Sequence, residues 1–446
     1  MVAILQLLIC VLLFGGYFFL RPRNKNVGLF LMDAYLLGIS IYVTGSTYSE
    51  LFLNYSDSGS VADIARVSLM SAIAGAIIFL CVFQNRYPKS VIYQRLLLVN
   101  PGRLERAFVV GGMLLCGSVM VVFILSVFRN DSIGALLSIA SITGDNSLTA
   151  ARKMITSGSE GYFAPGYIKQ FRDILPAILL SAFMLQKGLQ KWKSSEKLIF
   201  FSFMLIALSA NLVAGQRGVL FILFVTLAIS KFFCIKSGRA LGINSDQGYG
   251  LVVLPILILF FIFGAMSLLL GRVQNESGSN FIVLYDVVAN MVERIFLASV
   301  VENTNAFYMW DTDLGRGGAY WLEELGKVLP GSQGQGLSNY LAQANGASSE
   351  GNSPLGLPAD LWFTWGWLGL IFFPAVYALG VGVIDLLLHR FNGPLAFGSR
   401  IYFMIILPFI FSPYGFVLYG GVVVVILVIG VGVLRKGKLL RNVAFT

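Results

Sequence analysis

Apolar runs of about 20 residues recur along the whole length of this 446-residue chain. A run of this length spans the hydrocarbon core of a bilayer when it forms an α-helix. Charged residues make up 12% of the chain, well below the share of about a quarter in soluble proteins, and the mean hydropathy is +0.79. The pattern therefore predicts an all-α polytopic membrane protein and excludes a large soluble domain.

We predict about 11 transmembrane helices in a single integral membrane domain, residues 1–446. No basic residue precedes the first apolar run, so this run is predicted to be a retained helix rather than a cleaved signal peptide. The approximate bounds of the predicted spans are 2–20, 28–46, 64–84, 107–128, 173–187, 198–214, 218–235, 250–271, 362–386, 401–415 and 417–434.

The basic residues give the orientation. Most of the 32 lysines and arginines, Arg400 among them, fall in segments that this threading places inside, which predicts an outside N-terminus and a cytoplasmic C-terminus. The sequence pI of about 9.4 is then a signal of topology, and no nucleic-acid partner is expected. The four cysteines lie within or at the inner end of apolar runs, and His389 is the single histidine, so neither an outside disulfide nor a His-ligated metal is expected.

Two outer loops are long, at about 129–172 and 272–361. The second loop contains NFIVLYDVVANMVERIF, in which the polar residues Asp286, Asn290, Glu293 and Arg294 recur at helical spacing. This spacing predicts an amphipathic helix at the outer interface. The rest of the loop is rich in Gly, Ser and Asn.

Arginines on the predicted outer side oppose the topology rule. An arginine near hydrocarbon costs free energy unless it snorkels or is paired with an acid, and this structural explanation is preferred for Arg66, Arg129 and Arg294. Arg217 stands in the tight turn Gly-Gln-Arg-Gly between two spans, and Arg172 heads a span close to Pro176, so each is held at a fixed depth.

A guanidinium group binds two phosphate oxygens at once, so arginines fixed at the outer rim predict a phosphate-bearing ligand. Anion transporters also use arginine, and this alternative remains open. The candidate ligand-binding residues are Arg152, Arg172, Arg217, Arg272 and Arg316.

Asp360 stands two residues after a proline and directly before an aromatic run. Its position suits a helix N-cap, and its carboxylate suits a general base at the outer rim; the two roles are compatible. Trp362 and Trp365 fit an interfacial aromatic belt, and their rings can also stack on sugars. Asp311 and Asp313 have the spacing of cation ligands, but salt bridges with Arg316 are preferred.

The order of these motifs resembles the Wzy-type oligosaccharide repeat-unit polymerases, the O-antigen polymerase family. The resemblance covers roughly residues 145–390 and rests on ARKMITSGSEGYFAPGYIKQFRDILP, AGQRGVLF and SPLGLPADLWFTWGWLGLI. It implies a GT-C-like membrane glycosyltransferase of the bacterial cytoplasmic (inner) membrane, with its active site on the outer (periplasmic) face. Such an enzyme transfers a growing glycan from undecaprenyl diphosphate to the non-reducing end of a new lipid-linked unit.

Within this resemblance, Asp360 and Arg217 are the expected catalytic residues, with arginines in place of a metal cation. No cofactor is expected, and a chain-length regulator is a possible protein partner. Three alternatives remain: an O-antigen ligase, disfavoured because no histidine stands at Asp360; a flippase or transporter for the same lipids; and a purely structural or assembly role. Asp33 is the only ionisable residue expected deep in a span, which favours chemistry at the surface over translocation.

Overall fold

The structure of the chain is a computed structural model that describes residues 2–20, 31–53, 58–83, 103–129, 168, 170–188, 190, 192–214, 217–240, 357–390, 393–407, 424 and 428–430. In this part of the chain every regular element is a helix. Five helices are long and apolar enough to cross a membrane: Gly59–Phe83, Arg103–Phe128, Ser194–Val213, Gly218–Ile235 and Asp360–His389. The predicted span 250–271, most of the predicted span 417–434 and the predicted amphipathic helix lie outside the described residues.

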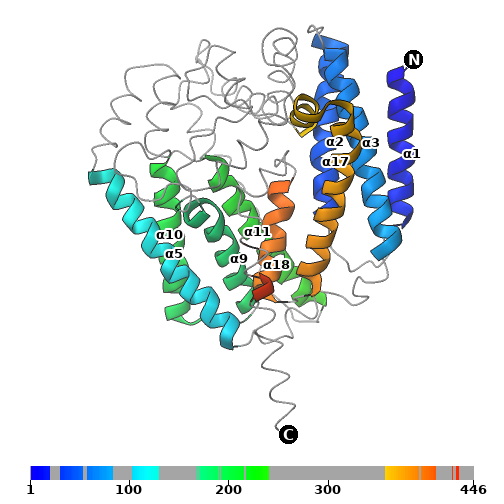
Figure 1. Ribbon diagram of the computed structural model, residues 1–446. Coiled ribbons are helices and arrows are strands. Elements are labelled where there is room, and N and C mark those ends of the chain that lie inside the picture. Colours follow the sequence, from blue (N-terminus) through cyan, green and yellow to red (C-terminus); the bar gives the residue numbers. More distant parts are fainter. Residues whose placement is uncertain are drawn as a thin grey trace, which may run out of the picture. The chain divides into compact units, whose positions relative to one another are not determined.

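The chain divides into two compact units, and each contains segments that are distant in sequence. The first unit contains α1 (Val2–Leu20), α2 (Leu31–Tyr48), η1 (Ser49–Leu53), α3 (Ser58–Phe83) and most of α17 (Leu357–Arg390). The second contains α5 (Arg103–Arg129), η3 (Gln170–Ile174), α9 (Leu175–Lys187), α10 (Ser194–Val213), α11 (Arg217–Ala240) and nearly all of α18 (Pro394–Ile406). The α-helices among these elements are labelled in Figure 1.

In the first unit, α3 packs against α1 and α2, and small residues let it approach α17 closely. A Cβ on Gly75 would lie 2.5 Å from the Cα of Ala375, and one on Gly382 would lie 2.8 Å from the ring of Phe79. Contacts of this kind stabilise helix pairs in lipid, where the hydrophobic effect between helices is weak. Ser71 and Tyr35 add hydrogen bonds to the carbonyls of Ile371 and Pro374, at 2.5 and 3.2 Å.

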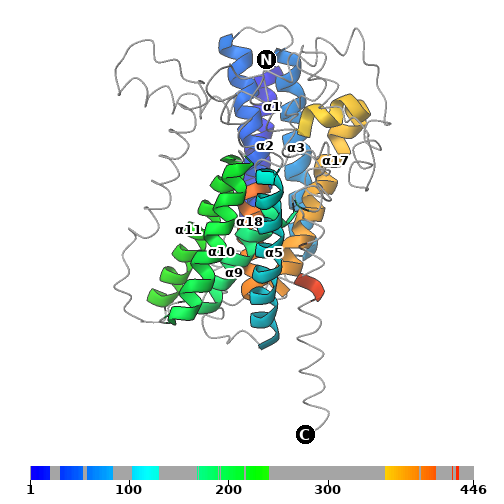
Figure 2. The same cartoon turned by 90° about the vertical axis from the view of Figure 1, so that its left-hand side faces the viewer.

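Helix α17 is broken near its start. Gly366 has φ 61° and ψ −145°, a conformation that side-chain-bearing residues rarely adopt. The break separates a short arm, residues 357–365, from a long arm, residues 367–390, and Figure 2 shows the short arm lying across the axis of the long one. A Cβ on Gly369 would meet the Cβ of Trp365 at 2.6 Å and the carbonyl oxygen of Leu361 at 2.7 Å. The two glycines therefore allow the arms to fold closely together.

In the second unit, α9 lies at the centre and packs against α5, α10 and α11. Ten of its 13 residues are buried, which agrees with its apolar sequence on all faces. Pro176 stands in its first turn, where a missing N–H costs least. Ser181 on α9 and Ser230 on α11 are linked by a 2.6 Å hydrogen bond between their hydroxyls.

Glu105 joins α5 to the start of α18 inside the second unit. Its carboxylate accepts a hydrogen bond from the backbone N–H of Leu395 at 3.0 Å, and so satisfies an otherwise unpaired N–H in the first turn of α18. A Cβ on Gly393 would lie 2.5 Å from the same carboxylate oxygen. Gln186 donates to the carbonyl of Glu105 at 3.4 Å. Glu105 is thus buried, with 4% of its surface exposed.

Most predicted spans agree with the structure to within a few residues, but three expectations are wrong. The span predicted to start at residue 401 begins at Pro394, so Arg400 is buried within a helix instead of lying in an inside loop. The span predicted as one helix over 362–386 is broken at Gly366. Asp33 lies in the first turn of α2, where it accepts a 2.8 Å hydrogen bond from Tyr17, and so is not deep in the span.

We expect Gly366→Ala and Gly369→Ala each to destabilise the protein by about 1–3 kcal/mol, through backbone strain and a clash respectively. The matched control is Gly380→Ala on the long arm, because an added Cβ there meets nothing within 4 Å. Thermal unfolding of the purified protein in detergent measures the difference. Equal melting temperatures for the three variants would contradict the closely folded arms.

Candidate functional site

A buried arginine lies where η3 leads into α9. Arg172 is 2% exposed and donates two hydrogen bonds to the carboxylate of Asp173, from Nε at 2.6 Å and from Nη2 at 3.1 Å. Asp173 is 5% exposed, so the pair is withdrawn from solvent together. A bidentate carboxylate offsets part of the cost of burying the guanidinium.

Side chains from α5 and α10 surround this pair. The ring centroid of Phe123 lies 5.1 Å from the Cζ atom of Arg172, within range of a cation–π interaction. Asn211 donates to the carbonyl of Arg172 at 3.2 Å, and the thiol of Cys116 contacts the carbonyl of Phe171 at 2.8 Å. A π-helical turn leaves backbone groups without the usual helical partners, and such turns are frequent at functional sites.

Two polar atoms at this site have no hydrogen-bond partner among the described residues: Nη1 of Arg172 and Oδ1 of Asn211. Both are buried. A buried donor or acceptor left unsatisfied costs about 1–3 kcal/mol, so such atoms indicate a place for a bound water or ligand atom. The site can therefore donate a charged hydrogen bond to a further group.

Arg217 is the first residue of α11, three residues after the end cap of α10 at Ala214. Asn211, which contacts the Arg172 carbonyl, lies in the last turn of α10. Arg172 and Arg217 are thus placed at the same end of the second unit, although the side chain of Arg217 is outside the described part. Three further candidates, Arg152, Arg272 and Arg316, lie outside the described residues entirely.

Asp360 belongs to the first unit and is 5% exposed. It lies in the first turn of α17, three residues after the helix begins at Leu357, so the expected N-cap position is wrong. An acid in the first turn is still favoured by the helix macrodipole. Thr364 donates to the Asp360 carbonyl at 2.8 Å.

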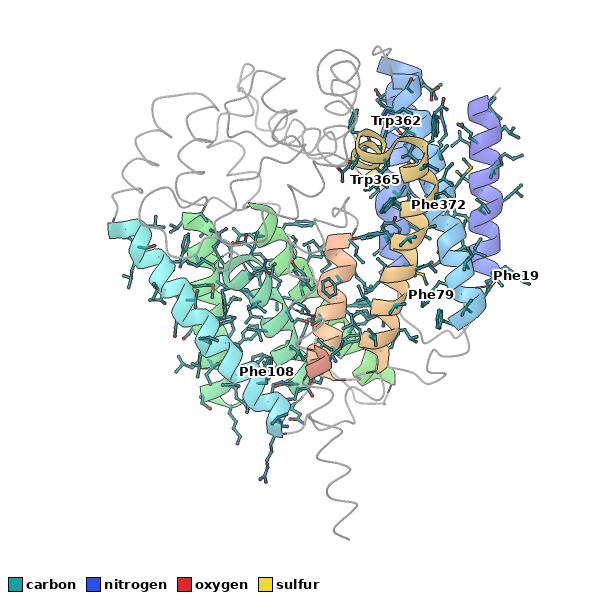
Figure 3. The ribbon with its side chains drawn as sticks, viewed as in Figure 1. Phe19, Phe79, Phe108, Trp362, Trp365 and Phe372 are labelled. Carbon is teal, nitrogen blue, oxygen red and sulfur yellow. The ribbon has the colours of Figure 1, made fainter. Side chains whose placement is uncertain are left out.

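The two tryptophans proposed to contact sugars lie on the short arm of α17, as Figure 3 shows. The ring of Trp362 lies edge-on to that of Trp367, with centroids 5.0 Å apart. The ring of Trp365 stacks on Phe373 at 5.5 Å, and 44% of Trp365 is exposed. Trp365 therefore keeps surface available for a ligand or for lipid headgroups.

The structural explanation for Arg66 is confirmed. This residue is wholly buried and uses all three guanidinium nitrogens: Nε donates to Gln6 at 2.7 Å, Nη1 to Glu50 at 2.9 Å and Nη2 to Asp63 at 2.8 Å. Asp63, three residues earlier on the same helix, was detectable from spacing. Gln6 and Glu50 were not, because they come from α1 and η1.

Metal ligation has no support in the described part of the chain, where no three His, Cys, Asp or Glu side chains are grouped for a shared ion. Asp311 and Asp313 lie outside that part, so the preference for salt bridges over cation ligation at these two residues stays a prediction.

The helices and their hydropathy define a multi-pass α-helical membrane protein. Comparison with protein-family models, curated proteins and solved structures gives no match to this chain. The function must therefore be inferred from the chain's own residues.

We expect Arg66→Met to destabilise the protein by about 2 kcal/mol or more, because Glu50 and Asp63 then lose their shared cation. The control is Arg106→Met on α5, where the arginine is exposed. The measurement is the thermal unfolding midpoint in detergent. An Arg66→Met variant as stable as the control would mean that this network contributes nothing to folding.

Proposed function

We propose that this protein is a metal-independent membrane glycosyltransferase that polymerises undecaprenyl-diphosphate-linked oligosaccharide repeat units, as in O-antigen or a related surface polysaccharide. It works on the outer face of a bacterial cytoplasmic membrane, in a GT-C-like fold of about 11 spans. Its substrates are lipid-linked glycans in the surrounding lipid, and a chain-length regulator is a candidate partner.

One observation carries the proposal: two arginines, Arg172 and Arg217, stand at the same end of one helical unit, and Arg172 retains a buried donor without a partner among the described residues. A guanidinium with an available N–H is suited to a phosphate oxygen. We assign Arg152, Arg272 and Arg316 to the same diphosphate-binding role on their sequence positions.

The chemistry requires a base and an anion-stabilising group. The acceptor hydroxyl loses its proton to Asp360 as its oxygen bonds to the anomeric carbon of the growing glycan. The bond from that carbon to the diphosphate breaks, and undecaprenyl diphosphate leaves with the electron pair. Arg217 and Arg172 stabilise the charge that develops on the leaving diphosphate. Trp365, and beside it Trp362, offer aromatic surface for the sugars.

A flippase or transporter for the same lipids is the second candidate, because the described helices bury more charge than the sequence indicated. Arg66, Asp173, Arg172 and Arg400 are all nearly inaccessible. Charge along a translocation pathway has to face an aqueous cavity. Arg66 is instead saturated by three protein partners, which favours the transferase. An O-antigen ligase remains less favoured because Asp360 stands where a histidine is expected.

We expect Asp360→Asn to abolish polymer formation and to leave the melting temperature nearly unchanged. An amide matches the carboxylate in size but cannot accept the proton. Polymer length on a gel is measured with lipid-linked repeat units, at matched protein concentration. The control is Asp33→Asn, because asparagine can still accept the hydrogen bond from Tyr17.

The control should make polymer like the wild type. Long polymer from a stable Asp360→Asn variant would remove Asp360 from the mechanism.

We expect Arg217→Lys to lose most polymerising activity although it keeps the positive charge, because lysine cannot bind two phosphate oxygens in one plane. The reduction should be about 100-fold, the order measured when a preorganised oxyanion donor is removed. The same gel assay gives the result at matched membrane abundance. Wild-type chain length from this variant would make Arg217 an interfacial anchor only.

A further inference from the structure

We propose that Asp173 is a resident counter-ion in the anion site of Arg172, and that the diphosphate group of the ligand replaces its carboxylate. The inference rests on the proposed function for the identity of the anion. It adds Asp173 to the residues of the proposed diphosphate site. It also adds a step to ligand binding, in which the diphosphate replaces the carboxylate.

The geometry of the pair is that of an occupied oxyanion site. The Asp173 carboxylate spans Nε and Nη2 of Arg172, which is the edge that a phosphate group binds in bidentate fashion. Nη1 remains without a partner among the described residues, and Phe123 lies near the guanidinium. A larger anion with more oxygens could use the edge and Nη1 together.

The charges explain why the two anions exclude each other. A buried guanidinium without a counter-ion is strongly unfavourable, so the unliganded protein needs Asp173 where it is. With Asp173 in place the site has no net charge. A diphosphate arriving beside the carboxylate would meet like charge, so its gain from Arg172 depends on the departure of Asp173.

The local backbone provides a route for that departure. Neighbouring residues of a regular α-helix are about 100° apart around its axis, so their side chains do not face each other. Arg172 and Asp173 are neighbours, and they pair within the π-helical turn Gln170–Ile174. A shift of this turn to α-helical register would separate them and open the guanidinium edge.

Arg66 provides the contrast within the same chain. Its three nitrogens are bonded to partners from three different elements, and none of these partners is its neighbour in sequence. Removing one partner by a local change of register would leave the other two in place. Arg172 has one carboxylate partner, which is its neighbour in sequence, and one N–H donor, Nη1, without a partner among the described residues. This arrangement is expected of an anion-binding site and not of a structural anchor.

The test uses the full-length protein in phosphatidylcholine nanodiscs, with inorganic pyrophosphate as the probe at constant ionic strength. A ligand that binds only the folded state raises the free energy of unfolding by RT ln(1 + L/Kd), where L is the ligand concentration, so the thermal unfolding midpoint begins to rise when the ligand concentration approaches Kd. We expect Asp173→Asn to have a lower midpoint than wild type without pyrophosphate. We also expect its midpoint to begin to rise at about tenfold lower pyrophosphate concentration, because the competing like charge is gone.

Two further variants complete the comparison. Arg172→Gln combined with Asp173→Asn should fold, because both charges leave together, and should show no response to pyrophosphate. Glu196→Gln is the matched control, since Glu196 is the acid partner of Lys187 in the same unit. It should respond to pyrophosphate as the wild type does.

The inference is overturned if Asp173→Asn needs as much pyrophosphate as wild type or more, or if the double variant still responds. If Asp173→Asn does not fold, Asp173→Glu takes its place. A longer acid fits the same buried space less well, so the pyrophosphate concentration at which its midpoint begins to rise should also fall below that of the wild type. An unchanged or higher concentration would contradict exchange.

Two further measurements distinguish a diphosphate from a single phosphate and from a lipid headgroup. Orthophosphate should stabilise less than pyrophosphate, because one phosphate group offers fewer oxygens. Phosphatidylglycerol in the nanodisc should not replace the pyrophosphate response. If it does, the anion is a lipid headgroup and the diphosphate assignment is wrong.

This experiment is independent of polymer formation. The predicted order of pyrophosphate responses from a protein that makes no polymer would support the counter-ion and reject the glycosyltransferase. Polymer formation by wild type together with an unchanged pyrophosphate response in Asp173→Asn would support the glycosyltransferase and reject the counter-ion.

Discussion

The free-energy cost of burying a charge away from water shapes both units of this chain. In the first unit, Arg66 draws together α1, η1 and α3 through three side-chain hydrogen bonds. In the second, Glu105 links α5 to the N-terminus of α18, and Arg172 is covered by α5 and α10 beside its own Asp173. Each buried ion fixes the helices around it, because separating them would leave a charge without a partner.

Departures from regular helix occur near these charges and at the candidate site. The π-helical turns η1 and η3 carry Glu50 and the Arg172–Asp173 pair, respectively. Gly366 breaks α17 and sets apart a short arm with Asp360 in its first turn. Irregular backbone in a membrane protein has to be satisfied by protein groups or by a cavity.

The fold class and most helix bounds could be predicted from the sequence, because a span is determined by the length of one apolar run. The start of α18 was missed because the helix contains Arg400, which a hydropathy argument assigns to water. The break at Gly366 was missed because hydropathy is continuous across WGWLG. At the site, Arg172 was found from its fixed position before Pro176. The roles of Asn211 and Phe123 depend on tertiary contacts that no local pattern encodes, and the pairing of Asp173 with its neighbour Arg172 depends on a π-helical turn that hydropathy does not reveal.

The central claim is that the protein forms glycosidic bonds at the expense of lipid diphosphate linkages. The most direct test incubates purified wild-type protein in vesicles with lipid-linked repeat units and measures polymer and free undecaprenyl diphosphate together. The account predicts one undecaprenyl diphosphate released for each linkage formed, with no loss in the presence of excess chelator. Movement of intact lipid-linked units between leaflets without release of undecaprenyl diphosphate would contradict it and identify a transporter.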